Sequence, residues 1–113
     1  MSAFAPIAHP TACPWGERAF SGYLGDDRTQ WAQWDATLLI PDATERLPLL
    51  VDQGTADEFL EQQLSPDALV DACEKAHHHI NLRMHRGYDH SYFFITSFIE
   101  DHLIHHGKAL GLV

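Results

Sequence analysis

The sequence predicts an α/β fold of about three parallel strands joined by crossover helices. Two observations lead to this prediction. Strand-like and helix-like segments alternate along the chain, which is the order of parallel βαβ units. Residues 47–54, LPLLVDQG, are almost continuously apolar, as in strands that are covered on both faces. The 113 residues fit one small domain, and no repeat, low-complexity tract or linker divides them.

The first part of the chain is predicted to form a strand, a long loop and a helix. Residues 2–8 form a short apolar strand. Residues 9–27 contain several prolines and glycines and are expected to make an ordered surface excursion. Asp26 or Asp27 then caps a helix that ends at Pro41. The core-facing residues of this helix are expected to be Trp31, Trp34 and Leu38.

The second part continues the alternation. Ser65 is expected to cap a helix, with Pro66 in the first helical position and Asp67 at the positive end of the dipole. Residues 80–85 alternate between apolar and polar and predict a strand. Gly107 is a plausible end for the last helix. The two helices are expected to bury Leu69, Val70 and Cys73, and Phe94, Ile95, Phe98, Ile99 and Leu103.

The composition excludes several classes of partner. Sixteen acidic residues against seven Lys and Arg give a formal charge of −9, which argues against a nucleic-acid backbone or an anionic membrane surface. No apolar run approaches the ~20 residues that span a bilayer, and the N-terminus does not read as a secretion signal. Cys13 and Cys73 fit no metal or redox spacing, so we expect reduced thiols and a cytoplasmic protein.

Two polar residues follow two neighbouring predicted strands. Asp57 comes shortly after the strand at 47–54, and His90 comes shortly after the strand at 80–85. Because neighbouring parallel strands end on the same side of a sheet, these two loops can meet. A carboxylate that accepts from the imidazole N–H would fix its tautomer and stabilise the imidazolium. This is the orienting half of a nucleophile–base–acid system.

Structural interpretations of these residues stay open from the sequence. Thr55 and Glu58 fit a capping box, in which case Asp57 is an acid in the first turn of a helix. His90 could equally be a capping or core histidine. Asp52 and Asp89 are competing carboxylates, but Asp52 is expected to brace a loop at a strand terminus, and the side chain of Asp89 diverges from its neighbour.

Several stretches resemble one family. SAFAPI, CPWGERAFSGYLG, WDATLLI, LVDQGTADEFLEQQLSPDAL and GYDHSYFFITSFIEDHL are similar to the S-formylglutathione hydrolases, also called esterase D, of the α/β-hydrolase superfamily. The resemblance runs from residue 2 to about 110 and departs from the family pattern at His9 and Phe93. It implies a serine thioesterase that hydrolyses S-formylglutathione to glutathione and formate in formaldehyde detoxification, with some activity on carboxylic esters. By the same resemblance, Asp57 is the triad acid and His90 the triad base. Neither a cofactor nor a metal is expected.

The nucleophile of such an enzyme lies in a G-x-S-x-G elbow, and no serine here has that setting. Ser2, Ser21, Ser65, Ser91 and Ser97 all lack a glycine two residues before and after. We therefore expect residues 1–113 to be an incomplete α/β-hydrolase domain, the C-terminal part, with the elbow and the oxyanion-hole donors upstream. Loss of a triad serine removes about 10⁶-fold in turnover, so the chain is expected to be inactive alone.

Other functions remain as alternatives. The strand at 2–8 would have an unpaired edge, open to self-association or to an N-terminal half that carries the nucleophile. The chain could instead be a noncatalytic remnant. A metal-binding module is the third alternative, because the nine histidines include His77, His78 and His79 in a row and a second group on the last helix. That second group consists of His102, His105 and His106.

Overall fold

The computed structural model describes residues 1–44 and 47–112. Three parallel strands form one sheet in the order β1 (Ser2–Phe4), β2 (Leu49–Gly54) and β3 (Ile80–His85). All six residues of β2 are buried, which confirms the prediction of a doubly covered central strand. The predicted strand at 80–85 is also confirmed.

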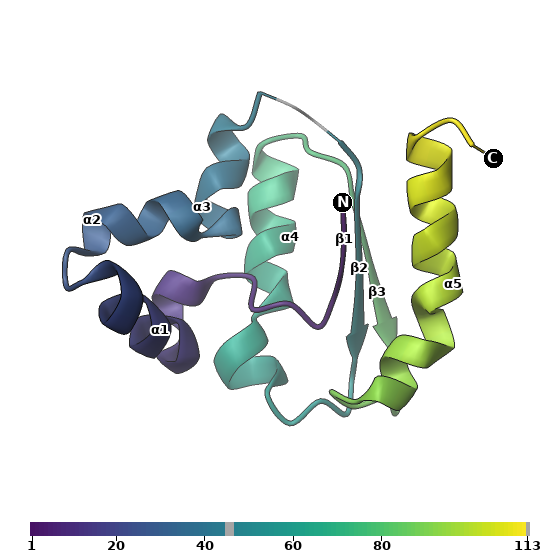
Figure 1. The fold of residues 1–113 in the computed structure, drawn as a ribbon, viewed down its shortest axis with the longest axis horizontal. Coiled ribbons are helices and arrows are strands. Elements are labelled where there is room, and N and C mark those ends of the chain that lie inside the picture. The colour runs from purple at the N-terminus through teal and green to yellow at the C-terminus, as the bar shows by residue number, and fades with distance from the viewer. Residues whose placement is uncertain (45–46, 113) are drawn as a thin grey trace.

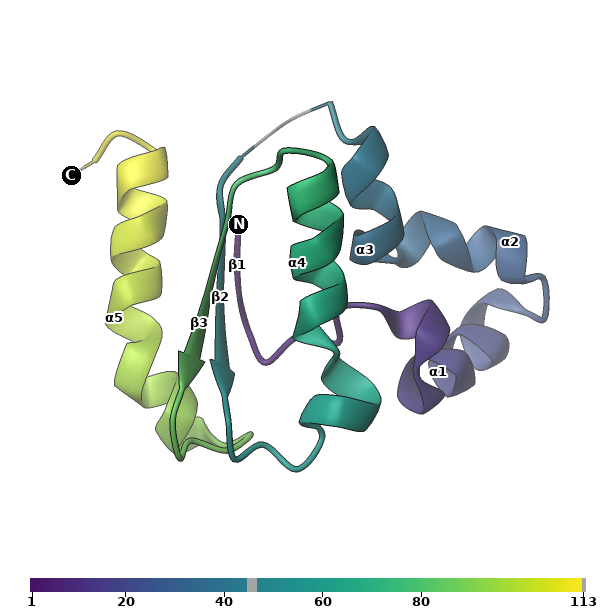
Figure 2. The ribbon, with the colours of Figure 1, turned by 180° about the vertical axis from the view of Figure 1, so that it is seen from behind.

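Helices cover both faces of this sheet. Figures 1 and 2 show α5 (Tyr92–Ala109) on one face, with α4 (Pro66–Lys75), α3 (Ala36–Leu39) and the N-terminal helices on the other. Apolar side chains fill the space between layers in two clusters, one built on Val51, Leu69 and Cys73 and one on Leu64 and Phe94. The α/β class with three parallel strands and crossover helices is therefore confirmed. No helix of the described part of the chain is long and apolar enough to cross a membrane.

The first strand is shorter than the predicted span of residues 2–8. The ladder ends where Phe4 lies opposite Asp52, and the N–H of Ala5 still donates to the carbonyl of Asp52 at 2.8 Å. Ala5 then has a φ of 44°, in the left-handed region, which turns the chain away from the sheet. Pro6 follows and cannot continue the ladder.

The predicted surface excursion at 9–27 is ordered and mostly exposed, but it contains a helix that the prediction did not include. A short 3₁₀ turn (Pro10–Ala12) leads into α1 (Pro14–Leu24), whose cap is Cys13. The Sγ of Cys13 accepts from the N–H of Gly16 at 3.4 Å. A Cβ on Gly16 would lie 2.0 Å from the Pro10 carbonyl oxygen, so glycine allows the turn to pack against the helix. In this segment, a proline begins the helix and a glycine allows it to pack closely, so neither residue marks a loop.

The predicted helix after Asp27 is broken into short pieces. Asp27 caps it as predicted, but the helical turns fall into α2 (Arg28–Trp31), η2 (Ala32–Trp34), α3 and η3 (Ile40–Asp42). The side chain of Asp35 causes the break, because its Oδ1 accepts from the backbone of Thr37 and Leu38 and starts a new helix. Of the predicted core-facing residues, Trp31 is buried, whereas Trp34 is 63% exposed and Leu38 is also exposed.

Two further helix predictions need correction. Ser65 occupies the cap position of α4, with Pro66 and Asp67 as predicted, but its side chain makes no capping hydrogen bond. A π-helical turn, η4 (Leu60–Leu64), runs directly into α4 and forces Ser65 into the left-handed conformation (φ 43°, ψ 57°). In α5, Phe94 and His102 are the buried residues, while Ile99 and Leu103 are exposed, and the helix continues beyond Gly107.

The orientation of α5 follows from a buried carboxylate in the middle of β2. The sequence led us to expect that Asp52 braces a loop at a strand terminus, but this residue lies within the strand. Arg83 donates to both of its oxygens at 2.6 Å, and its oxygens also lie 2.8 Å from His85 Nε2 and 2.7 Å from His102 Nε2. Burial by itself raises the pKa of Asp52, but the hydrogen bonds from Arg83, His85 and His102 outweigh it and lower the pKa from 3.8 to about 2.

The first prediction concerns the stability that this network supplies. Asp52→Ala leaves Arg83 without its main partner, so we expect the free energy of unfolding to fall by about 3–5 kcal/mol at pH 7 in urea titrations. The matched control is Asp89→Ala, because Asp89 is an exposed carboxylate, and we expect it to change stability by less than about 0.5 kcal/mol.

The same network gives an acid dependence. Since the folded-state pKa of Asp52 is lowered to about 2, its ionised form stabilises the fold above about pH 4, and that contribution is lost as the pH falls towards 2. The shift from 3.8 corresponds to about 2 kcal/mol. Asp52→Ala should therefore lose less stability than the parent between pH 4 and pH 2. Equal acid sensitivity of the two proteins would contradict this assignment.

Candidate active site

The loops after β2 and β3 meet at the carboxyl edge of the sheet. The N–H of Thr55 donates to the His85 carbonyl at 3.0 Å, and the N–H of Ala56 donates to the Tyr88 carbonyl at 2.9 Å. Gly54 makes this approach possible, because a Cβ there would lie 2.1 Å from the Tyr88 carbonyl oxygen. The expectation that these two loops lie together is confirmed.

This contact brings Asp57 and His90 together. His90 Nδ1 lies 2.8 Å from Asp57 Oδ2. The Asp57 side chain is 0% exposed and that of His90 is 42% exposed. In the part of the chain that the structure describes, His90 Nε2 has no hydrogen-bond partner. The pair thus combines a buried carboxylate with an imidazole whose second nitrogen can reach a substrate or a nucleophile.

Three donors hold the Asp57 carboxylate. Its Oδ1 accepts from the N–H of Phe59 at 2.9 Å, and its Oδ2 accepts from His90 and from Gln53 Nε2, the latter at 3.1 Å. The ring of Phe59 also packs edge-on against the His90 ring, with centroids 5.7 Å apart. Backbone and side-chain contacts therefore fix both the acid and the imidazole plane.

The structural interpretations of this pair are resolved by these contacts. The Thr55–Glu58 capping box does not form, because Thr55 Oγ1 accepts from the N–H of Gly87 at 3.0 Å. Asp57 does stabilise a turn through Phe59, but it contacts His90 as well. His90 is too exposed for a core residue, and α5 begins after Ser91 without a side-chain capping hydrogen bond.

Sequence reasoning also missed the histidine–carboxylate pair of His9 and Asp35. His9 Nδ1 lies 2.8 Å from Asp35 Oδ2, and Thr11 donates to the same oxygen through its N–H and its hydroxyl. Burial raises the pKa of Asp35, but the hydrogen bonds from Thr11 and His9 outweigh it and lower the pKa below its usual value. The pair joins residues 26 positions apart, and no local pattern signals it. It ties the segment after β1 to the start of α3.

The structure places none of the chain's serines against His90. Ser21 and Ser97 donate to carbonyls within their own helices. Ser2 Oγ lies 2.8 Å from His106 Nε2, a contact that sequence reasoning also missed. Ser2 begins β1, so this pair lies at the amino end of the strands, whereas His90 follows their carboxyl end. Among the described residues, no carboxylate contacts His106, so Ser2 and His106 do not form a nucleophile–base–acid set.

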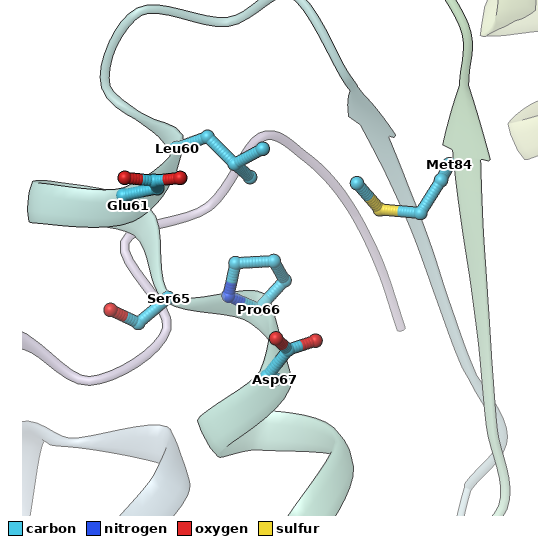
Figure 3. Close-up of a pocket in the computed structure, with 6 residues that line it drawn as sticks. All are labelled: Leu60, Glu61, Ser65, Pro66, Asp67 and Met84. Carbon is cyan, nitrogen blue, oxygen red and sulfur yellow. The ribbon is translucent and has the colours of Figure 1, made fainter.

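Ser65 lines a pocket of about 390 Å³. Figure 3 shows its hydroxyl pointing away from Met84, which lines the opposite side. The titratable residues that line this pocket are Glu61 and Asp67. His90 is not among the lining residues. No histidine of the described part of the chain lines this pocket, so Ser65 is not placed against the His90 imidazole.

The histidines also have structural contacts. His78 Nε2 lies 2.8 Å from the Leu47 carbonyl oxygen, and His102 belongs to the Asp52 network. Over residues 1–44 and 47–112, no group of three or more His, Cys, Asp or Glu side chains is arranged to hold a metal ion.

The fold is of the α/β class, with three parallel strands and helices on both faces, and comparison with known proteins gives the family. Residues 1–105 match the family described as "Putative esterase". The chain belongs to this family, which confirms the resemblance found in the sequence. Its curated relatives are S-formylglutathione hydrolases: that of Arabidopsis thaliana is 49% identical over 99% of this chain, and that of Rattus norvegicus is 48% identical over 98%.

Solved structures agree with this assignment. An S-formylglutathione hydrolase from Agrobacterium tumefaciens superposes with a TM-score of 0.90 and 45% identity over 95% of this chain and 39% of its own. Esterase B of Lactobacillus rhamnosis, at 13% identity and a TM-score of 0.67 over 99% of this chain and 42% of its own, shares the fold. The chain spans about 40% of the length of the curated relatives it matches.

The second prediction tests the hydrogen bond of the pair in the isolated chain. A proton held between His90 Nδ1 and the buried Asp57 carboxylate exchanges slowly and resonates downfield of ordinary imidazole protons. Nitrogen-edited proton NMR should show this signal, and Asp57→Ala should remove it. Asp35→Ala is the matched control, since it should remove the signal of His9 and leave that of His90. A His90 signal that persists in Asp57→Ala would contradict the geometry.

Proposed function

We propose that this chain supplies the acid–base pair of an S-formylglutathione hydrolase, which converts S-formylglutathione and water to glutathione and formate in formaldehyde detoxification. The observation that carries the proposal is the 2.8 Å contact between the buried Asp57 carboxylate and the exposed His90 imidazole. The two curated relatives and the solved structure named above support the choice of substrate. Simple carboxylic esters are expected as further substrates.

In this mechanism His90 Nε2 accepts the proton of a serine hydroxyl as that oxygen attacks the thioester carbonyl. Asp57 keeps the Nδ1 proton in place and stabilises the imidazolium. His90 then donates the proton to the departing glutathione thiolate, which leaves a formyl-enzyme. In the second half, His90 takes a proton from water, the hydroxide attacks the formyl carbon, and the proton returns to the serine as formate leaves.

The nucleophile is proposed to come from outside these 113 residues, because none of their serines lies in a G-x-S-x-G elbow. Without that hydroxyl the proton-transfer pair has no group to activate. Loss of a triad serine removes about 10⁶-fold in turnover, and each missing oxyanion donor removes a further 10²–10³-fold, roughly. The isolated chain is therefore proposed to be inactive.

The third prediction uses a chimera. Residues 1–113 replace the matched 40% of the Arabidopsis thaliana enzyme, and hydrolysis of S-formylglutathione is measured. We expect an active chimera, with kcat about 10⁴-fold lower for Asp57→Asn and about 10⁴- to 10⁶-fold lower for His90→Ala. His9→Ala, which breaks the His9–Asp35 pair, should change kcat by only a few-fold. A folded chimera without activity, or equal effects of His9→Ala and His90→Ala, would contradict the proposal.

A nucleophile-bearing segment is proposed to dock at the open side of the sheet. β1 pairs with β2 on one side, and its other edge has no strand partner among the described residues. Beside it lies a cavity of about 210 Å³ lined by apolar side chains, among them Ile7, Ile40 and Leu69. Because the chain spans about 40% of its relatives' length, we favour the remaining part of the hydrolase over a second copy of this chain as the occupant.

The fourth prediction concerns this docking. Ile7 lines the cavity and is still partly exposed, so Ile7→Lys should weaken recovery of the chain with the remainder of the Arabidopsis enzyme by about 10- to 100-fold in co-expression. Leu103→Lys is the control, since Leu103 is an exposed aliphatic residue of α5, on the opposite face of the sheet. A homodimer that Ile7→Lys dissociates would instead assign the surface to self-association, and no binding at all would favour a noncatalytic remnant.

A cytoplasmic location is part of the proposal. Cys13 and Cys73 are both free and buried, which is typical of proteins in a reducing compartment.

A further inference from the structure

Gln53 is the residue next to the acid–base pair whose contacts the proposed mechanism does not explain. It follows Asp52 in β2, and its side chain is fully buried. Its Nε2 donates to Asp57 Oδ2 and to the Gly54 carbonyl oxygen, both at 3.1 Å. The reversed amide would place its oxygen against these two acceptors, so the hydrogen bonds fix the orientation.

The other end of this amide has no partner. Of the buried side-chain nitrogen and oxygen atoms that the structure describes, three lack a hydrogen bond: Gln53 Oε1, His78 Nδ1 and His105 Nε2. Of these residues, Gln53 contacts the acid–base pair. A buried carbonyl without a donor is unfavourable, and such groups in folded proteins are normally satisfied.

The unpaired oxygen is itself enclosed, because Gln53 is 0% exposed. The amide is therefore kept at an energetic cost, and one of the two bonds that its Nε2 makes is to Asp57 Oδ2. A buried polar group with an unsatisfied atom beside an acid–base pair indicates a role in the site.

We propose that Gln53 is a positioning residue for the acid–base pair: its side-chain amide donates to Asp57 and holds the carboxylate that orients His90. The inference rests on the proposed function, because Gln53 would act through that pair. The amide and the imidazole donate to the same oxygen of Asp57, so loss of the amide changes the orientation of the carboxylate and hence of His90.

The fifth prediction tests the amide in the chimera. Gln53→Met should lower kcat about 10- to 100-fold with little change in KM, the range for one hydrogen bond to a charged group. Gln53→Glu should be active at low pH, where a protonated carboxyl donates as the amide does, and lose activity as the pH rises and two carboxylates face each other. Gln63→Glu is the matched control, because buried Gln63 accepts from the Trp15 N–H and glutamate can do the same.

A second measurement keeps the inference independent of activity. In NMR spectra of the isolated chain, Gln53→Met should shift the His90 Nδ1 proton, and Gln63→Glu should not. If Asp57→Asn inactivates the chimera while Gln53→Met does not, the positioning role is wrong and the proposed function stands. If the chimera is inactive, the proposed function fails, and an unmoved His90 proton overturns the role of Gln53 separately.

Discussion

The ionised carboxylate of Asp52 is the constraint on which the rest of the structure depends. It lies in the central strand and takes four hydrogen bonds from β3 and α5. His102 draws α5 onto the sheet and stacks on Phe4 of β1, with ring centroids 3.9 Å apart. One buried charge therefore links all three strands to the helix that follows the loop of His90. Because α5 begins two residues after His90, this network also sets where the imidazole stands.

Asp52 and Asp57 show why a histidine–carboxylate contact is not by itself a catalytic feature. Both carboxylates are buried and both accept from imidazoles. The side chains of His85 and His102 are only 17% and 4% exposed, and they share Asp52 with Arg83, so that carboxylate is already saturated with donors. His90 is the partner that stays half open to solvent. In the proposed function, the exposure of the second ring nitrogen, more than the distance to the carboxylate, distinguishes a histidine that transfers protons from one that only holds the fold together.

The sequence was sufficient for features that depend on local pattern. The apolar run of β2, the alternation in β3 and the placement of Asp57 and His90 after parallel strands follow from periodicity and sheet geometry. Prediction failed for two different reasons. Asp35 caps a new helix through Thr37 and Leu38, a local signal that the tryptophan spacing outweighed in the sequence. The contact of His102 with Asp52, which leaves Ile99 and Leu103 facing solvent, joins residues 50 positions apart, and spacing does not encode it.

The hydrogen bonds that hold Asp57 and His90 bear on what the rest of the proposed hydrolase would need to contribute. Every hydrogen bond found for Asp57 and His90 comes from within the described residues, through Gln53, Phe59 and the loop contacts at Gly54. In the proposed function, the acid–base pair is therefore in place without any group from the nucleophile-bearing segment. The outer edge of β1 has no strand partner among the described residues, and the proposal places that segment there. Preorganisation of the pair lowers the entropy cost of docking, so the proposed segment needs to supply a hydroxyl and its oxyanion donors, and not to rebuild the base.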